Sequence, residues 1–511
     1  MEKSQPPALL FTLFFILFQT VFSTTLPLMA GVYIAEDLGG SRAILTYAIS
    51  FYSLGNGLGV PFGRPLASRL GTVNLITSCL FLYALLTLAC GLAPNLPIFI
   101  FYRLLQGVVG GPIIATIVRF ISLLFPERDK TVLNSIVITI FAVGPVVGAT
   151  WGGFIAYELD WRYIFYANVP LLIIAALFLG FKMRQHEETI TPTPFDVVGS
   201  IFYCIAATCC FIAIITGQEL DWFRSNLITG LIVGGALSLL FFILWSLRHP
   251  YPFLAFDLFR KPAFLFAIIN LAILFSTYFG MVILIALWLN LDVDYTPIWI
   301  GILLSHMAIA GALPSLLLGR RLARIDCRYP LAIALLCFAG SAFHTMFFNV
   351  EINFGRIAFS RILLGFGLAF FLPSLFRLCF HSFSEERAGD VTGVFQVVRS
   401  FASCIGTAVY TTMWLRREVF YHERLGSALT LFSSQTKNFF NIAERIHLKG
   451  GAANARLAQL LDRQSTALAL DDCFYFFGLI TVGLIVMLAL TSLLNGALFK
   501  PESRPPFLKP E

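Results

Sequence analysis

The chain has 511 residues, a net charge of +7, 58% hydrophobic residues and only 12% charged residues. A soluble globular chain carries about a quarter charged residues, so this composition excludes a soluble protein. The modest net charge gives no reason to expect nucleic acid as a partner. Apolar runs recur along the chain at about twenty residues, the length that an α-helix needs to cross the hydrocarbon core of a bilayer. The sequence predicts an all-α polytopic membrane protein.

Fourteen apolar runs follow one another in chain order. The first is too long for the apolar core of a cleavable signal peptide, so it is predicted to be an uncleaved span. The predicted spans are 8–34, 43–63, 73–93, 97–124, 131–156, 163–183, 198–217, 227–247, 263–290, 297–318, 330–349, 357–381, 389–415 and 473–498. The longest connection, 416–472, mixes apolar and charged residues, which predicts short amphipathic helices.

The distribution of Lys and Arg predicts the orientation. An even number of spans places both termini on one side of the membrane. If that side is the cytoplasm, the inner segments hold eighteen Lys and Arg and the short outer loops hold four. Because cytoplasmic loops carry the excess of basic residues, both termini are predicted to be cytoplasmic. The connection 416–472 is then periplasmic or extracellular.

Short motifs recur in the two halves of the chain at nearly one offset. The recurring pairs are Gly63-Arg64 with Gly319-Arg320, Arg103 and Gly107 with Arg361 and Gly365, and Glu127-Arg128 with Glu386-Arg387. An equal orientation of the repeats predicts two parallel halves related by an axis along the membrane normal. The predicted organisation is a six-helix bundle over 8–183, two extra helices over 198–247, and a second six-helix bundle over 263–498 that contains the 416–472 loop. The binding site is expected where the halves meet, near mid-membrane.

These motifs resemble the major facilitator superfamily, and specifically its fourteen-span drug:proton antiporters of the EmrB/QacA type. The matching positions are Gly63, Arg69 and Gly71 in the signature loop, Arg103, Gln106 and Gly107 in span 4, Gly144, Pro145, Gly148, Gly152 and Gly153 in the antiporter motif of span 5, and Gly319 and Arg320 in the second signature loop. The segment 219–223, Glu-Leu-Asp-Trp-Phe, is also typical of this branch.

The residues of span 5 agree with that resemblance on physical grounds. Gly144, Gly148 and Gly152 recur every fourth residue, and small residues at this spacing allow close contact between membrane helices. Pro145 lacks a backbone N–H and permits a bend. Such a helix suits a rocking motion at the interface of two halves. The alternative is that these glycines only pack helices.

The resemblance implies a secondary transporter in the inner (plasma) membrane that exports hydrophobic or amphipathic small molecules by alternating access, linked to protons. It further implies an EmrA-type periplasmic adaptor as a partner. No phosphate-binding loop or metal-ligand spacing occurs, so neither a cofactor nor a metal is expected, and the chain is predicted not to be an enzyme. The alternative is an importer or facilitated-diffusion uniporter of an organic solute, anions included, without direct proton coupling.

The chain departs from this family where proton coupling is concerned. Ser23 stands where relatives have an acidic residue in span 1, and no acidic residue lies deep in a predicted span. The ionisable residues inside the spans are mainly arginines, which favours anionic or neutral substrates. Candidate transport or coupling residues are Arg103, Gln106, Arg361, Arg399, Ser23 and His306. For the arginines, helix packing through backbone carbonyls is the alternative role.

Overall fold

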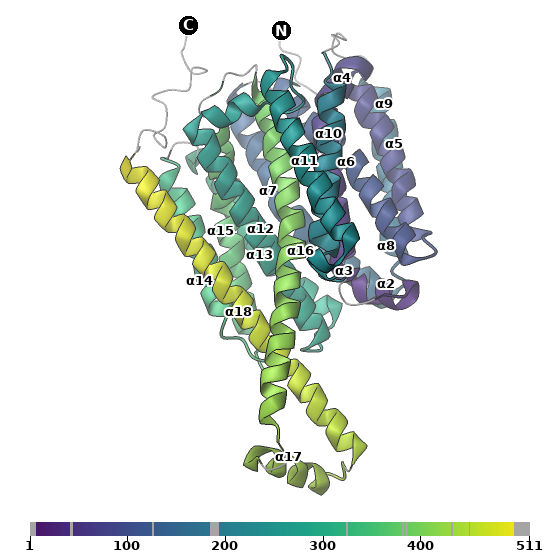
Figure 1. The fold of residues 1–511 in the computed structure, drawn as a ribbon. Coiled ribbons are helices and arrows are strands. Elements are labelled where there is room, and N and C mark those ends of the chain that lie inside the picture. The colour runs from purple at the N-terminus through teal and green to yellow at the C-terminus, as the bar shows by residue number, and fades with distance from the viewer. Residues whose placement is uncertain are drawn as a thin grey trace.

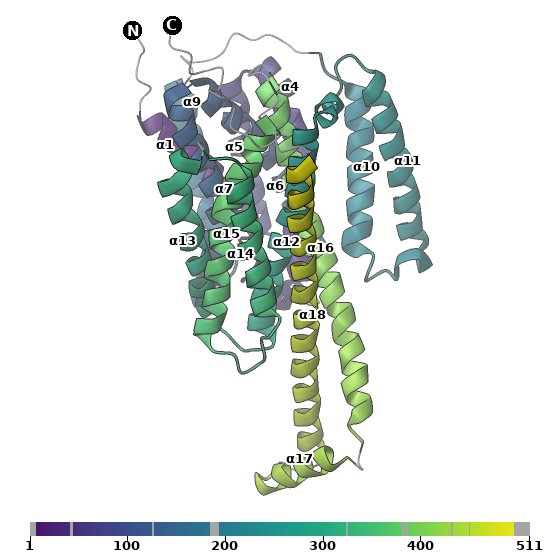
Figure 2. The same ribbon diagram turned by 90° about the vertical axis from the view of Figure 1, so that its left-hand side faces the viewer.

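The computed structural model describes residues 7–40, 44–124, 127–183, 194–322, 325–380, 383, 387–430, 433–448 and 450–494. These residues are helical almost throughout, and no strand occurs among them. The prediction of an all-α fold is therefore confirmed. Figure 1 shows the long helices running roughly side by side, and Figure 2 shows α1 beginning and α18 ending at the same end of the molecule, here called the terminal end.

The N-terminal half contains α1 (Pro7–Phe22), α2 (Gly31–Leu38), α3 (Ile44–Gly59), η1 (Val60–Phe62), α4 (Gly63–Leu70), α5 (Thr72–Gly91), α6 (Leu96–Leu124), α7 (Glu127–Glu158), α8 (Tyr163–Tyr166) and α9 (Asn168–Met183). It is followed by α10 (Val197–Thr216), η3 (Trp222–Arg224), α11 (Asn226–Arg248) and η4 (Phe256–Arg260). The C-terminal half contains α12 (Pro262–Leu291), α13 (Pro297–Leu322), α14 (Arg328–Thr345), α15 (Phe354–Phe380), α16 (Ala388–Ala428), α17 (Ser434–Arg445) and α18 (Gly451–Leu494).

The two halves pack their helices in equivalent ways. In the N-terminal half α3 lies against α6, and in the C-terminal half α13 lies against α15. The halves meet along two lines, where α7 packs against α13 and α3 packs against α16. If only the long helices are counted, each line pairs the second helix of one half (α3 or α13) with the fifth helix of the other (α16 or α7). This arrangement is what a duplicated, parallel pair of bundles would produce.

Ten helices among the described residues are long and apolar enough to cross a membrane. The other predicted spans correspond to α1 and α3, which have 16 residues each, and to α14 and α16. The structure thus supports a multi-pass membrane protein, and the count of fourteen spans stays a prediction.

The first predicted span, 8–34, is not one continuous helix. The chain leaves helix α1 after Phe22, continues as turns over residues 23–30, and forms α2 from Gly31. Pro27 contributes to this break because it has no backbone N–H to donate. Side chains from other helices bond the backbone carbonyls that the break frees, as described below.

The prediction of short amphipathic helices over 416–472 is also mostly wrong. Helix α16 continues without interruption to Ala428, and α18 begins at Gly451, so both membrane helices extend far beyond the bundle. With 44 residues, α18 is about 66 Å long at 1.5 Å per residue. Neither helix contains proline, which would have ended it. Figures 1 and 2 show the projecting hairpin, with only the short amphipathic helix α17 at its tip.

Helices α10 and α11 form a hairpin that stands beside the main bundle (Figure 2). Its terminal end is fixed by the buried side chain of Asp196. One carboxylate oxygen of Asp196 accepts hydrogen bonds from the backbone N–H of Gly199 at 2.7 Å and from Trp245 Nε1 at 3.0 Å. The other accepts from the backbone N–H of Phe253 at 3.3 Å. One carboxylate therefore ties the start of α10 to α11 and to the segment that leads to α12.

We expect the chain's C-terminus and the α16–α18 hairpin to lie on opposite sides of the membrane. A reporter fused after Leu494 should report the cytoplasm, and one inserted between α17 and α18 should report the outside. Activity of both reporters on the same side would overturn this topology.

Candidate functional site

Arg103 is fully buried in the N-terminal half and bonds the break in the first span. Its Nη2 donates to the carbonyl oxygens of Ser23 at 2.7 Å and Thr24 at 3.1 Å. Its Nε donates to the Ala48 carbonyl at 3.3 Å, and its Nη1 to Gln106 Oε1 at 2.6 Å. The guanidinium thereby joins α1, α3 and α6 and supplies the donors that the unwound backbone needs. This geometry supports the packing role left open by the sequence.

Two neighbours complete the surroundings of Arg103. The guanidinium carbon lies 4.4 Å from the centroid of the Tyr52 ring, a distance at which the ring face attracts a cation. Gln106 Nε2 donates to Thr87 Oγ1 of α5 at 2.8 Å. The Arg103–Gln106 pair therefore holds four helices of the N-terminal half together.

Arg361 occupies the equivalent place in the C-terminal half. It follows the start of α15 by seven residues, as Arg103 follows the start of α6. Its Nη1 donates to the carbonyl of Met281 in α12 at 3.2 Å, and its Nη2 donates to Thr345 Oγ1 and Ser360 Oγ, both at 2.9 Å. Met281 and Ser23 are separated by the same 258 residues as Arg361 and Arg103. The repeat in the sequence is thus a repeat of one arginine clamp on the first helix of each half.

The glycines that follow the two arginines are also equivalent. A Cβ at Gly107 would overlap the carbonyl oxygen of Tyr52, and one at Gly365 would overlap the carbonyl oxygen of Met307. Each glycine lets two helix backbones touch, α3 with α6 and α13 with α15. Only glycine permits this approach, because every other residue carries a Cβ.

Three glycines of α7 lie along the first span. Gly144 faces Val21, a Cβ at Gly148 would overlap the carbonyl oxygen of Phe22, and a Cβ at Gly152 would overlap that of Leu26. Thr25 Oγ1 also donates to the carbonyl of Pro145. The glycines of this motif therefore let the backbone of the broken first span pack directly against α7.

Gly153 lies on another face of α7, toward α13. A Cβ there would come within 2.7 Å of Met29 Cβ and 3.1 Å of Pro297 Cβ. Farther along this contact, Thr150 Oγ1 donates to the carbonyl of Gly301 at 3.2 Å. The motif in α7 thus serves two contacts at once, one inside its own half and one between the halves.

Arg399 differs from the other two buried arginines because it lies between the halves. It belongs to α16, and its guanidinium carbon lies 4.4 Å from the ring centroid of Phe141 in α7 and 5.6 Å from that of Phe275 in α12. Its Nε donates to Gln396 Oε1 at 2.7 Å. Among the described residues, no group accepts a hydrogen bond from its Nη atoms. Arg399 is only 7% exposed and follows the start of α16 by eleven residues, or about 16 Å.

The surroundings of Arg399 offer donors and aromatic faces. Gln396 Nε2 is buried with no partner in the described part of the chain, and so is the hydroxyl of Tyr278, whose ring centroid lies 5.7 Å from that of Phe275. The fully buried carboxylates among the described residues, Asp196 and Asp292, stand at helix ends instead. The site therefore offers hydrogen-bond donors that an anion could accept from. Sequence analysis missed Gln396, although its spacing of three residues from Arg399 mirrors the Arg103–Gln106 pair.

The remaining candidate residues take less central places. Ser23 is buried, and its hydroxyl donates to the Gln19 carbonyl at 2.8 Å. His306 Nδ1 lies 2.7 Å from the Ile302 carbonyl of its own helix, and its ring faces Phe354 in the same half. The structure therefore does not bring His306 to Arg399.

The signature loop after the second span forms α4 and its ends. Gly63 packs closely on α6, and Arg69 lies 5.5 Å from the ring centroid of Phe195. Gly71 has a φ of +84°, a left-handed conformation that glycine adopts without strain, and it turns the chain into α5. The side chain of Arg320 and the surroundings of Gly319 lie outside the described residues.

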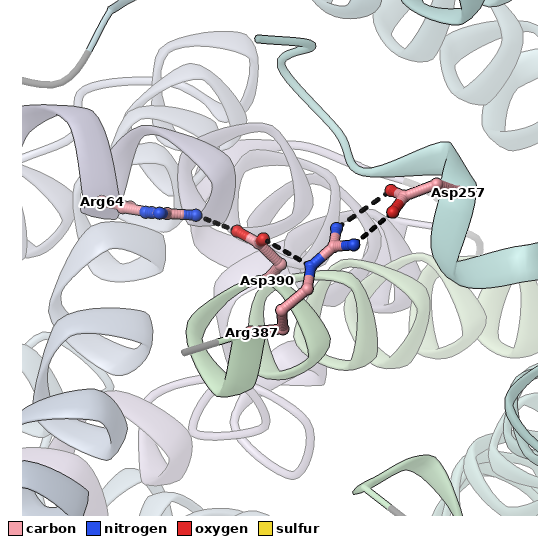
Figure 3. A network of polar contacts seen from close by, with 4 residues as sticks. All are labelled: Arg64, Asp257, Arg387 and Asp390. Atoms are coloured by element: carbon pink, nitrogen blue, oxygen red, sulfur yellow. Dashed lines mark hydrogen bonds and ion pairs between the residues drawn. The ribbon is translucent and has the colours of Figure 1, made fainter. Parts of the chain in front are cut away.

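A chain of ionic contacts joins the halves at the terminal end (Figure 3). Arg64 of α4 pairs with Asp390 of α16, and Arg387 Nε lies 3.6 Å from another oxygen of Asp390. Arg387 also pairs with Asp257 of η4, with Nη2 donating to Oδ1 at 3.0 Å. The hydrogen bond from Arg387 lowers the pKa of the Asp257 carboxyl below its ordinary value.

Comparison with known proteins agrees with this architecture. A model described as Major Facilitator Superfamily matches residues 10–407. The chain is 26% identical to the multidrug export protein EmrB of Escherichia coli K12 over 472 aligned residues, and this alignment covers 92% of each chain. It is 30% identical to the fatty acid resistance protein FarB of Neisseria gonorrhoeae over 422 aligned residues, and this alignment covers 82% of each chain.

Solved structures share the fold at lower identity. A peptide transporter POT matches with a TM-score of 0.61 and 13% identity, over 96% of each chain. A bacterial homologue of the lysosomal transporter Spinster matches with a TM-score of 0.60 and 15% identity, over 96% of this chain and 98% of that one.

We expect Gly152→Ala to destabilise the protein, because its new Cβ would meet the Leu26 carbonyl oxygen in a packed seam. Overpacking of this kind costs about 1–3 kcal/mol, so the melting temperature in detergent should fall clearly. The matched control is Gly234→Ala in α11, where no atom lies within 4 Å of the added Cβ. That control should melt at or slightly above the melting temperature of the unchanged protein. Equal melting temperatures for the two variants would contradict the close contact between α7 and the first span.

Proposed function

Because the chain belongs to the Major Facilitator Superfamily and is a transporter rather than an enzyme, we propose that it exports hydrophobic or amphipathic small molecules, with a preference for anions, out of the cell by alternating access. The proposed organisation is two six-helix bundles, 8–183 and 263–498, with two extra helices over 198–247. The substrate site lies between the bundles, around Arg399.

The observation that carries the anionic preference is the position of Arg399. Its Nη donors face the interface of the halves with no hydrogen-bond partner among the described residues, and the rings of Phe141 and Phe275 flank it. A guanidinium binds a carboxylate through two parallel hydrogen bonds, and the rings would accommodate an apolar body. The similarity to a fatty acid resistance protein supports the same chemistry, since a fatty acid combines one carboxylate with an apolar chain.

Alternating access requires that contacts between the halves break and reform. The ionic contacts at the terminal end are partly exposed, with Arg64 51% and Asp390 21% exposed in their side chains. Pairs of this kind contribute about 0–1 kcal/mol each, so they would bias the equilibrium between open and closed forms without locking it. We propose that this network closes the cytoplasmic end while the opposite end opens.

Proton coupling is part of the proposal through the family and needs a group that titrates. Ser23 cannot titrate, and His306 lies away from the interface. Asp471 is a further candidate for the titrating group. It belongs to the long helix α18, and its Oδ1 is buried without a partner among the described residues. Its neighbour Asp472 is instead paired with Arg417 at 2.9 Å. Sequence analysis placed Asp471 in a loop and so passed over it.

The projecting hairpin is the proposed contact for an EmrA-type adaptor. Helix α17 carries apolar and charged residues on separate faces, and Ile442 and Ile446 are about half exposed at its C-terminal end. An exposed apolar surface that stands beyond the bundle favours a protein partner. Under the proposed orientation, this surface lies outside the inner membrane.

The alternative of an importer or uniporter is separated from export by direction and driving force. In proteoliposomes with an imposed pH gradient, a proton-linked exporter should move a lipophilic weak acid against its gradient, and a uniporter should not. Protein-free liposomes correct for the passive distribution of the acid.

In that assay we expect Arg399→Gln to lower transport of the lipophilic acid at least tenfold. Loss of a hydrogen bond to a charged group costs about 1.5–3 kcal/mol, which corresponds to this change. Arg399→Lys keeps the charge and should retain more activity. A lipophilic cation of similar size should be a poor substrate throughout. Better transport of the cation by the unchanged protein would refute the anionic preference.

We expect Arg64→Asp to shift the protein toward the form that is open at the terminal end, by about fivefold for a loss of 1 kcal/mol. The double variant Arg64→Asp with Asp390→Arg should reverse the shift, as measured by labelling of a cysteine placed between α4 and α16. If the double variant does not reverse the shift, the Arg64–Asp390 pair does not control this end of the protein.

The Asp257–Arg387 pair should persist at neutral pH, because the pKa of the Asp257 carboxyl is lowered and protonation therefore requires a pH below about 4.

A further inference from the structure

The turn between the two extra helices has an unusual backbone. Asp221 has a φ of +56° and Trp222 a φ of +49°, so two consecutive non-glycine residues are left-handed. Such conformations are unfavourable for residues that carry a Cβ and persist only where the surroundings impose them. The backbone N–H of Trp222 donates to the Gly217 carbonyl at 2.9 Å, which folds the indole back over the end of α10.

The folded-back indole connects the turn to α16. Trp222 Nε1 donates to Gln218 Oε1 at 3.2 Å, and the same oxygen accepts from Arg416 Nε at 2.6 Å. The guanidinium carbon of Arg416 lies 5.7 Å from the centroid of the Trp222 ring. Among the described residues, no group accepts a hydrogen bond from the Nη atoms of Arg416. The strained turn thus leaves a partly unpaired guanidinium on a flat aromatic surface.

Trp222 and Arg416 separate two adjoining hollows between the extra helices and α16. The outer hollow has a volume of 550 Å³ and is lined by polar and charged residues, Gln218, Asp221, Arg224 and Arg416, together with Trp222 and Phe223. The inner hollow has a volume of 380 Å³ and is lined mainly by apolar residues, among them Ile214, Val409 and Met413. Together they form one groove with a polar end and an apolar end.

The charge and depth of the groove match the surface of a bilayer. Arg224 and Arg416 outnumber the single acid Asp221, and Arg417 at the inner hollow is already paired with Asp472. Arg416 follows the start of α16 by 28 residues, or about 42 Å. Since a bilayer measures about 40–45 Å with its headgroups, Arg416 stands at headgroup level and Val409 and Met413 at the start of the hydrocarbon.

We propose that this groove binds an anionic phospholipid of the leaflet opposite the termini. Its phosphate contacts Arg416 and Arg224, and the first acyl carbons lie on Val409 and Met413. The groove belongs to the edge of the molecule, since α10 and α11 stand beside the bundle (Figure 2), so a lipid reaches it directly. The bound lipid would join the extra helices to α16, where Trp222 and Arg416 already meet.

The test compares the full-length protein in nanodiscs of phosphatidylglycerol and of phosphatidylcholine. We expect a melting temperature several degrees higher in phosphatidylglycerol, and a phosphatidylglycerol molecule retained in native mass spectrometry. Arg416→Gln should abolish the temperature difference and lower retention at least threefold. Arg424→Gln, which removes an equal charge two turns farther along α16, should leave both unchanged.

Two results would overturn the proposal. One is the same melting temperature in both lipids for the unchanged protein, and the other is an equal effect of Arg416→Gln and Arg424→Gln. If Arg416→Gln does not fold in phosphatidylcholine, Arg416→Lys serves instead and should retain part of the lipid preference. Laurate is the second probe. If laurate displaces the lipid and Arg416→Gln slows laurate export, the groove is a substrate path and the lipid assignment fails.

Discussion

A polar backbone group inside a bilayer must find its partner within the protein, because the hydrocarbon offers none. The first span of this chain is unwound at Ser23 and Thr24, and the guanidinium of Arg103 supplies the donors that their carbonyls need. An unsatisfied carbonyl would cost several kcal/mol at that depth. The same guanidinium also bonds Ala48 of α3, so it ties the unwound segment to α3 and α6, while α7 contacts that segment through its glycines.

The three buried arginines show how similar residues acquire different roles from their neighbours. Arg103 and Arg361 direct their donors to carbonyls and hydroxyls of their own half, which stabilises each bundle as a unit. Arg399 lies where the halves meet and has aromatic faces rather than acceptors around most of its guanidinium. This difference in surroundings is the basis for the anionic preference proposed above.

The contacts between the halves differ in kind from those inside each half. Along α7 and α13 they consist of small residues with a few hydrogen bonds, such as Thr150 with Gly301. At the terminal end they are partly exposed ion pairs of small individual free energy. The interior of each half, by contrast, is held by fully buried polar networks. This contrast is compatible with the alternating access proposed above.

The sequence by itself determined the helical class and the glycines and arginines that recur in the two halves, because hydrophobic length and repeated motifs are local properties. It could not show that span 1 is broken, since an apolar run has the same composition whether or not it is unwound. It also could not predict that α16 and α18 extend beyond the bundle. Only the tertiary structure separated Arg399 from Arg103, because a guanidinium's role depends on which acceptors the distant helices bring within about 3 Å.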